Sequence, residues 1–223
     1  MIDQAPPVEA VTPPVASDTS RPQCSPVADS WPKRALDVLG AAFAILLFLP
    51  LLLCIALMVR LESGGPVIFK QRRTGHQGRI FTIYKFRTMT VAEDSANVRH
   101  ATRDDVRITA FGGLLRKLSL DELPQFFNVL KGDMSLVGPR PHALAHDTYY
   151  GEQIPAYAER FRAKPGLTGL AQVNGLRGEI KDLRGMRDRI AADNLYIDCW
   201  SLGLDIAIAT KTALIVFRDP QAY

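Results

Sequence analysis

Residues Lys33–Gly65 read KRALDVLGAAFAILLFLPLLLCIALMVRLESGG, and this stretch decides the architecture of the chain. From Val38 to Val59 no residue carries a charge. At roughly 1.5 Å per residue, a helix of this length matches a hydrocarbon core of about 30 Å. A cleavable signal peptide is not expected, because about 30 residues precede the run and no small-x-small cleavage site follows it. The stretch is therefore predicted to lie in a membrane.

Pro50, in the middle of this run, favours a helix that enters the membrane and returns. A proline inside a helix removes one hydrogen bond and favours a kink or a break. Lys33 and Arg34 precede the run and Arg60 follows it, so the positive-inside rule prefers neither orientation of a span. A re-entrant helix bent at Pro50 keeps both basic flanks on the cytosolic side. From these features alone, a single span with a tolerated proline stays open.

Composition divides the rest of the chain. Residues 1–32 hold seven of the fifteen prolines and no glycine, which predicts a disordered tail. The 223 residues suffice for one domain with a sizeable core. We therefore expect a re-entrant membrane helix over residues 33–60 and a cytosol-facing catalytic domain over residues 61–223. Three cysteines without a CxxC pair, Cys24, Cys54 and Cys199, fit reduced thiols facing the cytosol.

A strongly basic segment follows the membrane run. It holds seven basic residues against one acid, and the chain as a whole has a formal charge of +4. Two short β-rich runs, residues 67–70 and 80–86, are predicted to pair through a turn at Gly75 and Gly78. Beside a membrane segment such charge suits anionic lipid headgroups or phosphates, although a merely solvated hairpin stays open. The hairpin lacks the aromatic residues of a nucleic-acid platform, so no nucleic acid is expected as a partner. The basic residues are Arg60, Lys70, Arg72, Arg73, Arg79, Lys85 and Arg87.

The remaining segments are predicted to be mostly helical. One short helix ends near Lys117, and another is ended by Gly132 just after its C-cap. Residues 154–161 and 186–200 carry helical spacing. Residues 201–217 suit either the membrane interface or the core. The fold class is therefore α+β and mostly helical: a re-entrant membrane helix-break-helix, a small β-hairpin and amphipathic interfacial helices around a cytosolic active site.

The motif SLDELPQFFNVLKGDMSLVGPRP, residues 119–141, places two carboxylates before a proline. Ser119 and Glu122 match a capping box, but that register would put Pro124 inside the helix, where it is costly. With Asp121 as the N-cap, the proline falls in the first turn, where no amide donor is needed. We therefore expect an irregular turn with both carboxylates near a helix start. Taken alone, these residues leave capping and catalysis equally open.

Phosphoryl transfer is the chemistry that such a pair could perform. An aspartate can attack phosphorus and form an acyl-phosphate intermediate. Its polyanionic target needs neutralisation by Mg²⁺ and by fixed cations, and Arg116, Lys117, Lys131 and Arg140 lie nearby in the sequence. No Walker P-loop, GxGxxG, GxSxG or DxD motif is present. His142 and His146 have the spacing of two metal ligands, but no third ligand is evident, so a zinc site is not expected.

Several ordered motifs together give the chain a resemblance to the monotopic phosphoglycosyl transferases, the bacterial sugar transferase family. It covers residues 33 to about 217, and its motifs are long and specific. The family's re-entrant helix is commonly broken at Ser-Pro, whereas this chain has Leu49-Pro50. The matching motifs are KRALDV, the apolar run with its proline, GGPVIFKQRRTGHQGRIFTIYKFRTM, RITAFGGLLRKLSLDELPQFFNVLKGDMSLVGPRP, KPGLTGLAQVNGLRG and WSLGLDIAIATKTAL.

This resemblance implies a two-step transfer of a sugar 1-phosphate from a UDP-sugar to polyprenyl (undecaprenyl) phosphate, with release of UMP. The matching nucleophile is Asp121, which would carry the phosphosugar, and Glu122 would help it to hold Mg²⁺. The matching substrate-binding residues are Lys85, Arg87, Arg116 and Arg140.

The resemblance also implies a setting: the cytosolic face of the bacterial inner membrane, contact with anionic lipids, and exopolysaccharide or other glycoconjugate assembly. The sugar is not determined by any residue, and a homo-oligomer is left open. Two alternatives remain from the residues themselves. They are a non-catalytic scaffold that binds anionic lipid and an aspartate-based lipid phosphatase.

Overall fold

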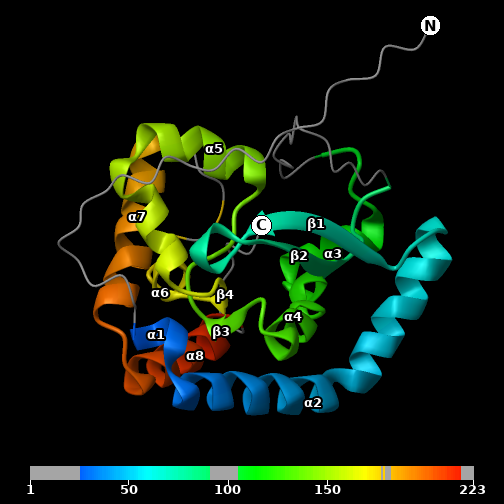
Figure 1. Ribbon diagram of the computed structural model, residues 1–223. Coiled ribbons are helices and arrows are strands. Elements are labelled where there is room, and N and C mark those ends of the chain that lie inside the picture. The colour runs from blue at the N-terminus through cyan, green and yellow to red at the C-terminus, as the bar shows by residue number, and fades with distance from the viewer. Residues whose placement is uncertain (1–25, 91–104, 177, 179–181, 217–223) are drawn as a thin grey trace, which may run out of the picture.

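The computed structural model describes residues 26–90, 105–176, 178 and 182–216. Across these residues the protein is a mostly helical α+β fold with one long apolar helix and two two-stranded sheets. In Figure 1 the long helix α2 runs along the bottom and up the right-hand side, the β1–β2 hairpin crosses the middle, and the helices of the C-terminal part lie on the left.

The last residues of the segment predicted as a disordered tail, residues 1–32, are folded. Residues 1–25 lie outside the described part of the chain. Residues Pro26–Asp29 form a helical turn, α1, and Val27 is buried in a hydrophobic cluster with side chains of the C-terminal half. A buried apolar side chain gains free energy that a solvated tail lacks, so this turn belongs to the folded domain.

Helix α2, Trp31–Ser63, is one continuous helix that bends. Pro50 lies in its interior, and Figure 1 shows the helix changing direction midway. The predicted helix-break-helix is therefore corrected to a bend without a break in the helix. A proline ring crowds the carbonyl four residues earlier, and its nitrogen donates no hydrogen bond. Bending relieves both effects while the flanking turns stay helical.

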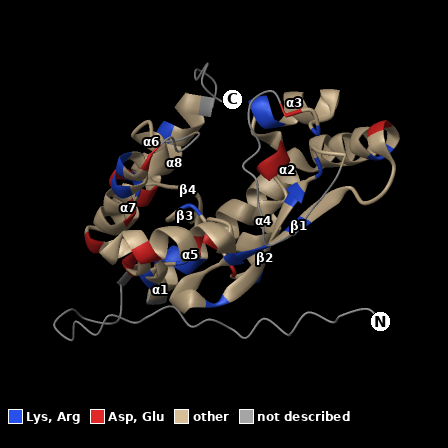
Figure 2. Ribbon diagram, turned by 90° about the horizontal axis from the view of Figure 1, so that it is seen from above, with Lys and Arg blue, Asp and Glu red and all other residues tan. Residues whose placement is uncertain are grey.

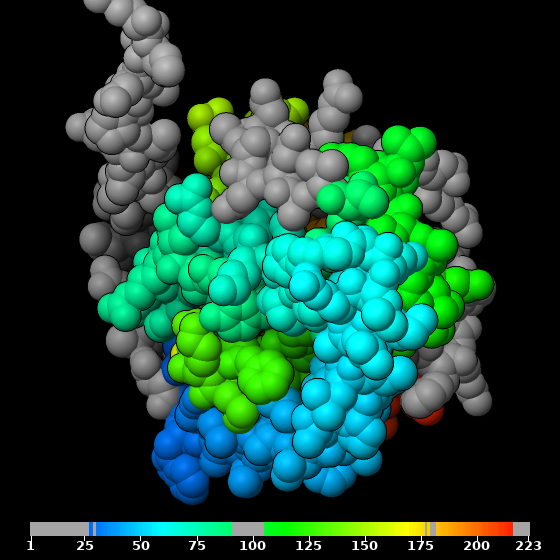
Figure 3. Space-filling view, turned by 90° about the vertical axis from the view of Figure 1, so that its right-hand side faces the viewer, coloured from blue at the N-terminus to red at the C-terminus, as the bar shows by residue number. Residues whose placement is uncertain are grey.

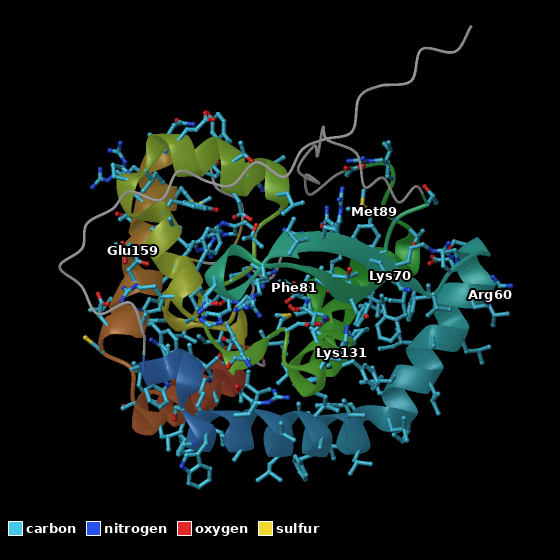
Figure 4. All side chains as sticks on the ribbon, in the orientation of Figure 1. Arg60, Lys70, Phe81, Met89, Lys131 and Glu159 are labelled. Carbon is cyan, nitrogen blue, oxygen red and sulfur yellow. The ribbon has the colours of Figure 1, made fainter. Side chains whose placement is uncertain are left out.

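Both halves of α2 pack on the same body. Ala41 in the first half contacts the cluster around Met134, and Val59 in the second half contacts the cluster around Leu115. The outer side of α2 is apolar and exposed, because only 17% of its most apolar 18-residue window is buried. Among the described residues, α2 is the helix with the length and composition to cross a membrane. Figure 3 shows the surface of α2 in blue and cyan, and Figure 4 shows side chains projecting outward from it. Its exposed apolar side chains include Leu39, Phe43, Leu46, Leu47, Leu53, Leu57 and Leu61.

The predicted basic hairpin is confirmed. Strands β1, Ile68–Thr74, and β2, Ile80–Phe86, pair antiparallel with Gln71 opposite Ile83. Strand β1 is longer than the predicted run, because the turn is confined to His76–Gly78. In Figure 2 blue segments on the otherwise tan hairpin mark its lysines and arginines. Since side chains alternate along a strand, Lys85 shares the face of buried Ile83 and does not point to solvent with its neighbours.

The acidic motif lies between two short helices, as predicted. Helix α3 is Ala110–Lys117, the 3₁₀ turn η2 is Leu120–Glu122, and helix α4 is Gln125–Lys131. Ser119 adopts a left-handed conformation, φ 56°, and makes no capping hydrogen bond, so the capping box does not form. Gly132 ends α4 with φ 92°, the conformation in which glycine avoids a Cβ clash.

The C-terminal part surrounds a short parallel pair of strands. In that pair Ser135 lies opposite Gly166, and Val137 opposite Thr168. Residues predicted as a helix over 154–161 form a 3₁₀ helix instead. The last helix buries Ile208 but exposes Leu214, so it takes part in the core and also presents an apolar side. The elements are β3 Ser135–Val137, α5 Leu144–Gln153, η3 Pro155–Arg162, β4 Gly166–Thr168, α6 Leu170–Val173, α7 Leu183–Asp198 and α8 Leu202–Val216.

A buried ionic cluster fastens the start of α2 to this part of the chain. Lys33 Nζ lies 3.0 Å from Asp205 Oδ2 on α8 and 3.4 Å from Asp37 Oδ1. It also donates to the carbonyl of Val137 on β3 at 3.0 Å. All three charged side chains are at most 5% exposed. One lysine thus holds a membrane-type helix, a strand and the last helix together.

Candidate active site

Glu122 is held by two cations from distant parts of the chain. Lys85 Nζ on β2 lies 2.8 Å from Glu122 Oε1, and Arg140 Nη2 lies 2.6 Å from the same oxygen. Arg140 Nη1 donates to Oε2 at 3.3 Å, so the guanidinium grips both oxygens. Burial alone would raise the pKa of Glu122, but Arg140 and Lys85 outweigh it and hold that pKa well below its usual range. Glu122 is therefore a fixed carboxylate.

Asp121, its neighbour, has a different environment. Its side chain is partly buried, and the described residues make no hydrogen bond or ion pair with its carboxylate. Burial raises the pKa of Asp121, Lys85 opposes that rise, and the charge of Glu122 adds to it. The 3₁₀ turn thus presents two adjacent carboxylates in unequal environments. Glu122 is paired with two cations, whereas the described residues make no ion pair with Asp121.

The six predicted site residues do not all meet. Lys85, Arg140 and the two carboxylates come together, and the charge of Arg116, from the last turn of α3, lowers the pKa of Asp121. Arg87 lies apart: its Nη2 donates to Ser63 Oγ at 2.8 Å and to the carbonyl of Gly64, at the end of α2. These contacts give Arg87 a place in holding the hairpin to α2. A role in substrate binding stays a prediction for it.

The loop that carries Arg140 is fixed by its backbone. Gly138 N donates to Thr168 O, and Gly166 N donates to Pro139 O, each at 2.9 Å. The backbones approach so closely that a Cβ on Gly166 would overlap the backbone of Gly138, and a Cβ on Gly138 would overlap the carbonyl oxygen of Lys164. Prolines on both sides of Arg140 restrict φ further. The sequence GPRP therefore sets one rigid position from which the arginine reaches Glu122.

Asn128 is a structural contributor that the sequence analysis missed. This side chain on α4 is fully buried, accepts a hydrogen bond from Tyr84 N at 3.0 Å and donates to Thr82 O at 2.7 Å. It therefore fastens α4 to strand β2, next to Lys85. An asparagine on the apolar side of a short helix was the available signal, because such a side chain needs a polar partner.

A second polar cluster lies behind the GPRP loop, and the sequence analysis missed it as well. His142 Nδ1 lies 2.6 Å from Arg160 Nη1 and 2.7 Å from the hydroxyl of Tyr157. Burial and the charge of Arg160 hold the pKa of His142 well below its usual range. The neutral ring therefore accepts a hydrogen bond. Among the described residues, no group of three potential metal-binding side chains includes His142.

Asp121 and Glu122 could hold Mg²⁺ only together with a ligand. Mg²⁺ in phosphoryl-transfer sites is commonly held by one or two carboxylates and completed by substrate phosphates and waters. The described residues bring no third carboxylate, histidine or cysteine to this pair. The carboxylate of Asp121 and the flanking cations fit an ion that arrives with a diphosphate. They do not form a permanent metal cage.

Comparisons with known proteins identify the family of this chain. Residues 28–219 match the family model described as bacterial sugar transferase. A Caulobacter vibrioides protein, UDP-glucose:undecaprenyl-phosphate glucose-1-phosphate transferase, is 54% identical over 86% of this chain and 72% of its own length. An Escherichia coli protein of the same name is 49% identical over 86% of this chain but only 41% of its own length.

A third relative is nearly the same size as the aligned segment. The exopolysaccharide production protein PSS of Rhizobium leguminosarum is 43% identical over 82% of this chain and 93% of its own length. The family match covers the bent helix, the basic hairpin, both carboxylates and the GPRP loop. The chain belongs to the bacterial sugar transferase family.

Proposed function

We propose that this protein transfers a sugar 1-phosphate from a UDP-sugar to undecaprenyl phosphate, as a membrane step in exopolysaccharide or other glycoconjugate assembly. UDP-glucose is the first donor to test, because the Caulobacter vibrioides and Escherichia coli relatives are named for it. The observation that carries the proposal is the asymmetry of the acidic pair. Glu122 is gripped by Lys85 and Arg140, whereas the described residues make no ion pair with Asp121, which lies beside the same cations.

The first step is an attack by a carboxylate oxygen of Asp121 on the β-phosphorus of the UDP-sugar. The bond between that phosphorus and the oxygen bridging to the α-phosphate breaks, and UMP leaves with the electron pair. A phosphosugar-aspartyl intermediate remains. Lys85, Arg116 and Arg140 would offset the charge of the diphosphate, without which one anion could not approach another.

The second step regenerates the aspartate. A phosphate oxygen of undecaprenyl phosphate attacks the same phosphorus, the bond to Asp121 breaks, and the undecaprenyl diphosphosugar is released. Mg²⁺ bound by Asp121 and Glu122 would supply charge neutralisation for the phosphates. Arg140 and Lys85 lower the pKa of Glu122, which favours its ionised form as a negative ligand.

The bent helix supports a location on the cytosolic face of the bacterial inner membrane. A helix that crosses a bilayer carries one half away from the domain, whereas both halves of α2 pack on the catalytic body. The bare apolar outer side of α2 would then lie in one leaflet as a re-entrant element. Such a shallow anchor would place Asp121 near the headgroups, where the phosphate of a polyprenyl lipid also lies.

The central test uses Asp121→Asn, which keeps the volume of the side chain and removes the nucleophile. We expect UMP release from UDP-glucose with Mg²⁺ and undecaprenyl phosphate to fall by on the order of 10⁴-fold or more. Without acceptor lipid, the unchanged protein should release a burst of about one UMP per molecule, because the intermediate accumulates. Asp133→Asn is the matched control, since this carboxylate pairs with the exposed Lys131. Full activity of the Asp121→Asn variant would exclude Asp121 as the nucleophile.

Product analysis separates transfer from the phosphatase alternative. With donor labelled in the β-phosphate, thin-layer chromatography should place the label in an undecaprenyl diphosphosugar. Label in inorganic phosphate would support a phosphatase. Lipid binding without any turnover, unchanged in Asp121→Asn, would support a scaffold. A panel of UDP-sugars would then identify the donor.

Topology is testable with the native cysteines. Variants that retain only Cys24, before α2, or only Cys199, after it, should both react with an impermeant maleimide in inverted membrane vesicles. Neither should react in intact spheroplasts. Cys54, exposed on the apolar side of α2, should be protected in both preparations. Reaction of Cys24 and Cys199 from opposite sides would establish a span in place of a re-entrant helix.

A further inference from the structure

Arg160 is the most deeply buried arginine near the catalytic pair. Its side chain is 2% exposed, and the residue lies in η3, 20 residues after Arg140. Its Nη2 donates to the backbone carbonyl of Arg140 and to Asp193 Oδ2, the latter at 2.9 Å. Its Nη1 donates to His142 Nδ1 at 2.6 Å. One guanidinium therefore holds residues on both sides of Pro141.

Asp193 fixes that guanidinium in turn. The carboxylate lies on α7, is 2% exposed, and forms the buried ion pair with Arg160. The hydroxyl of Tyr157 completes the cluster by donating to Asp147 Oδ1 at 2.7 Å while lying 2.7 Å from His142 Nδ1. The planar fork of an arginine presents five donors in a fixed geometry, whereas the three donors of an ammonium group spread from a single nitrogen and match these acceptors less well.

The loop of Arg140 is thus fastened from two directions. Its first residues are paired with β4 through Gly138 and Pro139, and its last residues are held by Arg160. Between them, the side chain of Arg140 reaches Glu122 at 2.6 and 3.3 Å. A displacement of about 1 Å would break such contacts, and misplacements of that size can cost on the order of 10²-fold in rate.

We propose that the buried Arg160–Asp193 pair is a positioning device that sets the guanidinium of Arg140 against Glu122. The inference rests on the proposed function, because its readout is sugar-phosphate transfer. Arg160 itself is enclosed by protein and cannot reach a nucleotide or a lipid phosphate from the surface. Its effect on the reaction passes through the backbone of the GPRP loop to Arg140, the arginine that contacts the catalytic pair.

A double-mutant cycle with Arg140 tests this route. Arg160→Lys keeps the charge but loses the fork, and we expect kcat/KM for the UDP-sugar to fall by roughly 10- to 100-fold. Added to Arg140→Lys, which has already lost the gripping guanidinium, the same change should lower kcat/KM by less than about threefold. A residue that only maintains the fold would lower kcat/KM by the same factor in both backgrounds. That result would overturn the proposal, as would an unchanged kcat/KM of Arg160→Lys alone.

Two further variants keep the test decisive. Tyr157→Phe removes only a hydroxyl from the cluster, so this variant replaces Arg160→Lys in the cycle if Arg160→Lys does not fold. We expect it to lower kcat/KM by roughly threefold in the unchanged protein and to have no effect in the Arg140→Lys background. Equal losses in the two backgrounds would again overturn the proposal. Arg162→Lys is the matched control on η3, where the side chain makes outer ion pairs with Glu159 and Asp198. It should leave kcat/KM unchanged in both backgrounds.

The unchanged protein separates the two proposals. If it releases no UMP from any UDP-sugar, the proposed function fails. If it is active and the Arg160 and Arg140 effects simply multiply, only the positioning role fails.

Discussion

Lys33→Met should destabilise the protein strongly, because one ammonium group compensates two buried carboxylates. Lys33 is 5% exposed at its side chain, and its partners Asp37 and Asp205 are 2% and 0% exposed. Methionine approximates the volume of lysine, so the change removes the charge more than the packing. Breaking a buried ion pair from one side typically costs about 3–5 kcal/mol. A domain is stable by roughly 5–15 kcal/mol, so the loss should be easily measured.

The hydrogen bonds that remain in Lys33→Met reduce the loss of stability but do not remove it. Asp37 Oδ1 would still accept from Ser135 Oγ and Leu136 N, both at 2.9 Å. Asp205 would still accept from Tyr196 at 2.7 Å and from Trp200 at 3.1 Å. These neutral donors satisfy lone pairs but do not balance two charges. We therefore expect a loss of at least about 3 kcal/mol in the free energy of unfolding.

The assay is denaturant unfolding of the detergent-solubilised protein, with thermal melting as a second measure. Asp205→Asn added to Lys33→Met should cost less than the sum of the single changes, with an interaction of about 1–3 kcal/mol. Lys131→Met is the control. Its side chain is 53% exposed and 3.2 Å from Asp133, and such a pair contributes about 0–1 kcal/mol. A Lys33→Met loss no larger than that of the control, or strict additivity with Asp205→Asn, would refute the reasoning.

Three other predictions concern the site and its scaffold. Lys85→Met should move the acid limb of the kcat/KM–pH profile to higher pH. The proposed nucleophile acts as a carboxylate, and Lys85 lowers the pKa of Asp121, so removing the lysine should raise that pKa. An unchanged acid limb would mean that another group titrates. Gly166→Ala should destabilise the fold by about 1–3 kcal/mol or more, since its Cβ would overlap the backbone of Gly138, and a melting temperature equal to that of the unchanged protein would contradict this. Chelation of Mg²⁺ should abolish UMP release and leave the melting temperature unchanged, because the described residues form no metal cage; a lower melting temperature would indicate a structural ion.

The sequence alone was sufficient to predict the structural features that depend on neighbouring residues. The uncharged run around Pro50 predicted a long apolar helix with a bend, since both the helix and its distortion follow from neighbouring residues. The glycine turn predicted the hairpin, and Pro124 predicted that the capping box would not form. The predicted break in the membrane helix was wrong: the helix is continuous and bent, because a proline can be accommodated without losing helical geometry on either side.

Long-range contacts decided what each charge does. Sequence treated Asp121 and Glu122 as one pair, but Lys85 and Arg140 converge on Glu122 from segments 37 and 18 residues away. No local rule specifies such a meeting, which depends on how β2, η2 and the GPRP loop pack.

Strand alternation also assigns Lys85 and Arg87 to one face. Strand β2 ends at Phe86, so Arg87 turns instead to the end of α2. The sequence by itself determined the family, the membrane-type helix and the candidate carboxylates. Only the tertiary structure separated Glu122, which is paired with two cations, from Asp121, with which the described residues make no ion pair, because electrostatic environment is a property of the packed molecule.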